Sequence, residues 1–141
     1  MSHADAGDPE SGLTLLELLV VVTILVLLSV AVGTVALNYL GGARSDAARL
    51  QIGQIAAGLD LYRLDMGSYP TPDEGLQALL EAPGGAEAWN GPYLRKEEAL
   101  LDPWGRPFDY VPQDDGRSFT LTSLGADGVE GGEDDDADIT N

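Results

Sequence analysis

The pattern of hydrophobic and polar positions begins with one long apolar run. From Leu18 to Leu37, twenty consecutive residues include no charged side chain, no proline and a single glycine, Gly33. At about 1.5 Å of rise per residue, a helix of this length crosses the roughly 30 Å hydrocarbon core of a bilayer. Backbone groups find no other partners in lipid, so such a span has to be helical despite its many valines. The run therefore predicts one membrane-spanning helix.

A second helical pattern follows the apolar run, from Ala43 to Leu64. Its apolar residues recur at three- and four-residue spacing, while charged residues lie off that stripe. The stripe consists of Ile52, Ile55, Leu59 and Tyr62. We interpret it as a packing face that covers the sheet formed by the rest of the chain. Gly41-Gly42 separates the two helical patterns and favours bending or local melting there.

The rest of the chain predicts short elements. Gly67 and Pro70 end the amphipathic helix, and residues 71–80 predict a short second helix that Thr71 or Asp73 caps. Alternating residues predict two strands joined by turn residues, with Phe119 and Leu121 facing the helix. The strands are Phe108–Val111 and Ser118–Ser123, and the turn residues are Asp115-Gly116. The fold class is therefore α+β, with a long N-terminal helix packed on a small antiparallel sheet.

Composition limits the classes of function. About 40 of the 141 residues form the N-terminal segment and the span, so about 100 remain for one domain. A net charge of −17 argues against binding nucleic acid through its phosphates. The chain has no cysteine, and its one histidine is His3, close to the N-terminus. Catalytic arrangements built on cysteine or histidine are therefore not expected, and we predict that the protein is not an enzyme.

One carboxylate, Glu17, lies at the edge of the apolar run. A charge at the centre of a membrane helix costs about 2.5–3.5 kcal/mol and less near an end, so Glu17 suggests a function. A plain anchor or an uncleaved signal segment is the simpler interpretation. A secretory signal peptide, however, has a basic start, a shorter apolar core and a cleavage site of small residues after that core. These features do not occur in that order here.

The segment Gly12-Leu-Thr-Leu-Leu-Glu17 resembles the class III leader-peptidase site of type IV pilins and type II secretion pseudopilins. The resemblance implies that a prepilin peptidase cleaves between Gly12 and Leu13 and that the new N-terminus is methylated. It also implies that Glu17 pairs with the free Leu13 amine of a neighbouring subunit during assembly. Two features depart from the family: Leu13 replaces the usual Phe, and the leader is acidic instead of basic.

Three longer blocks resemble one family, the major pseudopilin of the type II secretion system. They are residues 59–80, 93–110 and 123–141, with Asp-Pro-Trp-Gly and Ser-Leu-Gly-Ala-Asp-Gly as the specific motifs. The family implies a leader (residues 1–12), a transmembrane helix (13–40) and a periplasmic domain (41–141). It also implies a homo-oligomeric helical filament at the inner membrane of a Gram-negative bacterium that drives folded proteins across the outer membrane. Minor pseudopilins and an inner-membrane assembly platform would be its partners.

Two questions stay open beside this resemblance. A type IV pilus major subunit is the alternative, although such subunits usually carry a disulfide and this chain has no cysteine. Orientation rests on the resemblance alone. Arg44 and Arg49, taken by themselves, would place the C-terminal domain on the cytoplasmic side, because basic flanks favour that side.

The last segment is acidic and rich in glycine. Residues 127–141 contain seven carboxylates and no basic residue, which is typical either of a solvated tail or of a cation site. Calcium accepts six to eight oxygens in flexible geometry, whereas magnesium requires a stricter octahedron. The resemblance implies one calcium, bound by the Leu124 and Val129 carbonyls and by Asp127 and Asp138. The remaining ligand is open among Asp134, Asp135 and Asp136, with Asp136 preferred.

Overall fold

The structure is a computed structural model that describes residues 14–141. Its elements are the helix α1 (Leu15–Met66), the strands β1 (Asp109–Gln113), β2 (Ser118–Ser123) and β3 (Ile139–Thr140), and the short 3-10 helices η1 (Leu76–Leu79), η2 (Glu97–Leu100) and η3 (Asp134–Asp136). The contacts divide the described residues into two units, one that ends at Asn38 and one from Tyr39 to Asn141.

In the first unit, α1 exposes its apolar side chains. The large ones from Leu15 to Leu37 are between 45% and 87% exposed, and this stretch is the helix in the described residues that is long and apolar enough to cross a membrane. Its hydroxyl groups are satisfied internally. Thr23 and Ser29 each donate to the carbonyl four residues earlier at 2.7 Å, and Thr34 donates to the Ala31 carbonyl at 3.0 Å. Polar side chains bonded this way suit a lipid environment.

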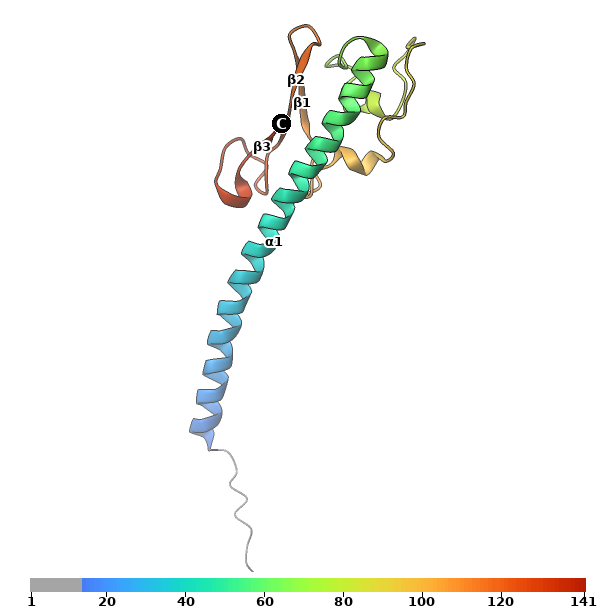
Figure 1. Cartoon of the computed structure of the whole chain (residues 1–141). Helices are drawn as coiled ribbons and strands as arrows, with labels where there is room; N and C mark the ends of the chain where they lie inside the picture. The colour runs from blue at the N-terminus through green and yellow to red at the C-terminus, as the bar shows by residue number, and fades with distance from the viewer. Residues whose placement is uncertain (1–13) are drawn as a thin grey trace, which may run out of the picture. The chain divides into compact units, whose positions relative to one another are not determined.

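In the second unit, the predicted apolar stripe is confirmed as the core face of α1. Ile52, Ile55, Leu59 and Tyr62 are each at most 4% exposed. They pack with side chains from η1 and the sheet, among them Leu79 and Leu121. Figure 1 shows the sheet beside the C-terminal half of α1. The α+β fold class is confirmed by this arrangement, because the helix face and the sheet face bury each other's apolar residues.

Two local expectations about helices differ from the structure. Gly41 and Gly42 are helical residues within α1, so the expected local melting is absent from this part of the described chain. The second helix is shorter than predicted: Thr71 caps a turn by accepting from the Glu74 amide at 3.3 Å, and only Leu76–Leu79 continue, as η1. The reason is Gly75, whose φ of +57° lies in the left-handed region and interrupts a helical path.

The sheet is antiparallel, with strand order β1-β2-β3. The predicted hairpin is confirmed, although β1 begins at Asp109 instead of Phe108, and Tyr110 pairs with Leu121. Leu121 is fully buried as expected, and Phe119 is half-buried against the core. The sequence did not predict β3, because a strand of two residues is too short to show alternation. This strand returns the acidic segment to the sheet.

A buried tyrosine makes the fold sensitive to alkaline pH. Burial and the nearby Glu74 carboxylate raise the pKa of Tyr62 to about 12. The unfolded chain therefore loses this proton first as the pH rises above 10, so the free energy of unfolding falls between pH 10 and about 12. We measure the free energy of unfolding by urea titration at several pH values in this range. We expect it to fall less steeply with pH in Tyr62→Phe than in the wild type. Tyr39→Phe is the control, since Tyr39 is exposed. An equally steep fall with pH in the wild type and in Tyr62→Phe would show that Tyr62 does not cause the alkaline sensitivity.

Candidate functional site

The candidate processing and assembly segment begins α1. Gly12 and Leu13 lie outside the described residues, so their predicted roles stay predictions. Glu17 is exposed in the first turn of the helix, and its amide donates to Thr14 Oγ1 at 3.2 Å. Thr14 therefore caps the helix N-terminus, a role that the spacing Thr-x-x-Glu would have indicated. The cap places the Glu17 carboxylate at the end of the exposed apolar helix.

The candidate calcium site is the acidic loop, residues 124–138, between β2 and β3. The loop folds tightly on itself, and the amide of Ala126 donates to the Asp135 carbonyl at 2.9 Å. Gly125 has a φ of +67°, and an added Cβ there would lie 2.8–2.9 Å from the backbone of residues 135–137. Only glycine fits this close approach of the two arms.

The predicted carboxylate ligands have different surroundings. Asp127 Oδ1 accepts from the Val129 amide at 3.0 Å, and Asp138 Oδ2 accepts from the Gly131 amide at 2.9 Å. The second oxygen of Asp138, Oδ1, is buried and has no hydrogen-bond partner. Asp136 is exposed, whereas the carboxylate of Asp135 occupies the space where a side chain at Gly41 would lie.

The structure does not gather these acids around one point. Among the described residues, no three side chains of aspartate, glutamate, histidine or cysteine come close enough together to hold a metal. A calcium site built partly from backbone carbonyls does not require three carboxylates at once. The buried, unpartnered oxygen of Asp138 is the feature that fits a cation, because burying a carboxylate oxygen without a partner is costly.

Two residues that hold the start of the loop were not among the predicted site residues: Asp102 contacts Ser123, the last residue of β2, and Arg106 contacts the loop itself. Asp102 is 5% exposed, and its carboxylate accepts from the amides of Trp104 and Arg106 and from Ser123 Oγ, at 2.7–3.0 Å. The Arg106 guanidinium donates to the carbonyls of Gly125 and Ala126, at 2.7 and 2.9 Å. The motif Asp-Pro-Trp-Gly-Arg marked this region in the sequence, but nothing in the motif indicated which loop Arg106 contacts.

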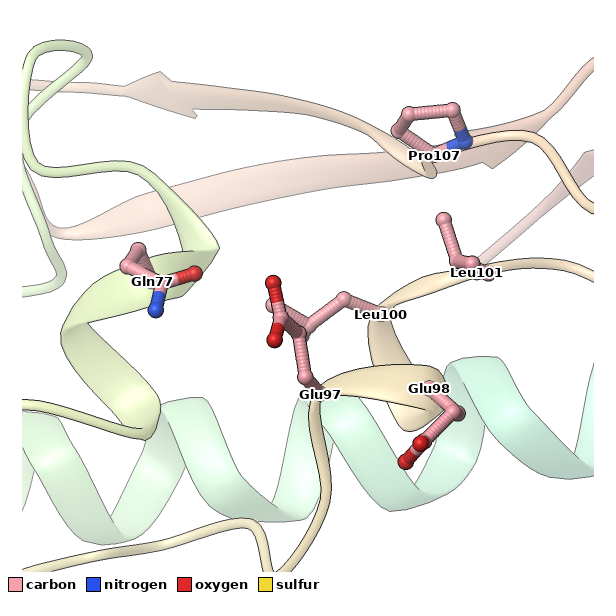
Figure 2. A pocket seen from close by; sticks show the side chains of 6 residues that line it. All are labelled: Gln77, Glu97, Glu98, Leu100, Leu101 and Pro107. Atoms are coloured by element: carbon pink, nitrogen blue, oxygen red, sulfur yellow. The ribbon is translucent and has the colours of Figure 1, made fainter.

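A depression of about 340 Å³ is lined by Gln77, Glu97, Glu98, Leu100, Leu101 and Pro107. In Figure 2, the adjacent carboxylates of Glu97 and Glu98 point in different directions, and both residues are exposed. Paired carboxylates that act as acid and base have to converge on one substrate. Glu97 and Glu98 do not converge in this way, and both lie exposed to solvent.

A capped, exposed apolar helix continued by an α+β domain defines the class of pilin-like subunits. Residues 36–141 match the family model described as "Type II secretion system (T2SS), protein G", and residues 8–33 match that of the prokaryotic N-terminal methylation motif. The chain belongs to the type II secretion system protein G family. It is a pseudopilin, and this family is one of structural subunits.

The similarity to individual proteins extends over nearly the whole chain. The type II secretion system core protein G of Pseudomonas aeruginosa is 43% identical over 136 residues, which cover 94% of each chain. The protein of the same name from Vibrio cholerae is 39% identical and covers 94% of this chain and 91% of its own. A crystal structure of the major pseudopilin from enterohaemorrhagic Escherichia coli is 32% identical, with a TM-score of 0.55 over 70% of this chain and 86% of that one. These relatives do not favour the alternative of a type IV pilus subunit.

Proposed function

We propose that the chain is the repeating subunit of a filament whose growth drives folded proteins across the outer membrane. The observation that carries the proposal is the exposed apolar surface of α1 between Leu15 and Leu37, in a pseudopilin of the type II secretion system. Such a surface has to be covered by lipid before assembly and by neighbouring helices after it. The subunit acts mechanically, without catalysis of its own.

The same proposal includes topology and partners. The apolar helix anchors the subunit in the inner membrane with one pass, and the domain from residue 41 onward lies in the periplasm. A prepilin peptidase processes the N-terminus, and the assembly platform and minor pseudopilins act with the subunit during filament growth. The match to the N-terminal methylation motif supports processing by such a peptidase.

Processing gives the first test. We expect the membrane-purified protein to lack residues 1–12 and to carry one added methyl group on Leu13, as measured by intact mass and N-terminal peptide mapping. Gly12→Val should leave the precursor unprocessed in the membrane, because the peptidase has to accommodate the residue before the cut. Ser11→Ala is the control and should be processed normally. A mature N-terminus at any other residue would overturn this part of the proposal.

We also propose that the acidic loop binds one calcium ion. The Leu124 and Val129 carbonyls and the carboxylates of Asp127, Asp136 and Asp138 would hold it. The buried, unpartnered Oδ1 of Asp138 supports the proposal, as do the glycines with left-handed backbone that allow the loop to close. When bound, the cation would offset repulsion among carboxylates in a segment without a basic residue. Its role is structural, since it would join the loop to the end of the sheet.

A further inference from the structure

We propose that Arg106 is the positioning residue of the acidic loop: its guanidinium holds the Gly125 and Ala126 carbonyls and so orders the loop before any cation binds. The two hydrogen bonds, at 2.7 and 2.9 Å, come from different nitrogens of one planar group, Nη1 and Nη2. A guanidinium that donates to two acceptors fixes orientation as well as distance. The first turn of the loop is thereby fixed to the Asp102–Arg106 turn.

The turn that carries Arg106 is itself held by a buried carboxylate. Asp102 Oδ1 accepts from the Trp104 and Arg106 amides, and its Oδ2 accepts from Ser123 Oγ at 2.7 Å. Ser123 is 1% exposed and is the last residue of β2, directly before the acidic loop. Asp102 therefore fixes both the backbone of Arg106 and the residue from which the loop starts. Substituting the Arg106 side chain leaves these backbone contacts in place.

The clamped carbonyls lie between two of the proposed calcium ligands. Leu124 precedes Gly125, and Asp127 follows Ala126, so holding residues 125 and 126 limits where both ligands can point. The guanidinium also lies against Gly128, where an added Cβ would stand 2.6 Å from Arg106 Cζ and Nε. Residues that orient metal ligands without touching the metal commonly lower the metal affinity about 10–100-fold when they are replaced.

Charge gives Arg106 a second effect on the loop. The chain has no lysine or arginine from Ser118 to Asn141, so the positive charge of Arg106 reaches the loop from another segment of the sequence. Its hydrogen bonds go to carbonyls instead of carboxylates, so the guanidinium does not occupy the carboxylate oxygens that a metal would use. Arg106 would therefore reduce repulsion in the metal-free loop without occupying the oxygens of Asp127 or Asp138.

Hydrogen exchange of the full chain in detergent micelles, in a calcium chelator, tests whether Arg106 orders the acidic loop. In Arg106→Ala and in Arg106→Lys, we expect amides of residues 124–132 to exchange about tenfold faster or more, with β1 and β2 unchanged. Arg106→Lys keeps the charge, but an ammonium cannot reproduce the planar two-carbonyl contact. Arg117→Lys is the control, because Arg117 Nε donates to the Asp114 carbonyl, in its own turn, and not to the acidic loop.

Three exchange results would overturn the proposal. Wild-type exchange of the loop in both Arg106 variants would show that the guanidinium does not order it. Equal acceleration in the loop and in β1 and β2 would show that Arg106 only stabilises the whole domain. Wild-type exchange of the loop in Arg106→Lys, with faster exchange in Arg106→Ala, would assign the effect to charge and not to the geometry of the guanidinium. This result also contradicts the proposal.

Calcium titration by calorimetry extends the test to the metal, and this part rests on the calcium site proposed above. We expect Arg106→Lys to raise the calcium Kd about tenfold or more, while Arg117→Lys keeps the wild-type Kd. A wild-type Kd in Arg106→Lys would overturn the positioning role. If the wild type itself binds no calcium, the proposed calcium site fails, and the exchange experiment in chelator still decides whether Arg106 orders the loop.

Discussion

We expect the full chain in detergent micelles to melt at a markedly lower temperature in a calcium chelator than in calcium. A ligand that binds only the folded state stabilises it by about 2.7 kcal/mol at a hundred times its Kd. For a domain of about 100 residues, this corresponds to roughly 10–20 °C in the melting temperature. Calorimetry or near-ultraviolet circular dichroism measures the shift. An equal concentration of magnesium should restore much less, because the irregular loop does not offer a strict octahedron of ligands.

Variants of the acidic loop separate binding from general charge effects. Asp127→Ala should erase the calcium response, because it removes a proposed ligand. Asp138→Asn should also erase it, while the melting temperature in chelator stays near that of the wild type, since the amide oxygen still accepts from the Gly131 amide. Glu130→Ala is the matched control: it removes one exposed charge of the same segment and should keep the response. Identical melting temperatures of the wild type in calcium and in chelator would show that the segment is a solvated acidic tail and not a calcium site.

The sequence predicted the large elements well because each has a strong physical signal. Twenty uncharged residues allow no other environment than lipid or a protein core, and the stripe from Ile52 to Tyr62 repeats with the helical period. The hairpin was predicted from alternation and from Asp115-Gly116, which adopt left-handed backbone at φ values of +54° and +78°. In each case the signal is local, so distant contacts were not needed to interpret it.

The features that sequence analysis missed depend on contacts between distant segments. Arg106 and Gly125 are 19 residues apart, and the contact between Asp135 and Gly41 joins the two ends of the second unit. The strand β3 exists because residues 139 and 140 reach β2, and not because their own pattern is strand-like. Periodicity within a short window cannot report such pairings. The ligand left open among residues 134–136 has the same origin, since three adjacent acids differ only in what they contact.

Glu17 can also stabilise the helix of its own subunit, because it lies in the first turn, which Thr14 caps. A test of assembly has to separate this effect from pairing between subunits. A carboxylate in the first turn stabilises a helix by about 0.3–1 kcal/mol through the helix dipole, and losing the Thr14 cap costs about 0.5–2 kcal/mol. Both effects act on one subunit alone. The proposed pairing of Glu17 with a neighbour's Leu13 amine acts between subunits and requires the negative charge.

We therefore expect Glu17→Gln to abolish or strongly reduce filament formation, with processing and membrane insertion unchanged. The amide keeps the size of the side chain but cannot neutralise an amine, and an unpaired charge in apolar surroundings is costly. Glu17→Leu makes the helix more apolar, so lost membrane stability cannot explain a defect there. Thr14→Ala weakens the helix end but leaves the carboxylate, and should still assemble. Sheared-filament assays and secretion measure the outcome, and normal filaments in Glu17→Gln and Glu17→Leu would show that assembly does not depend on this charge.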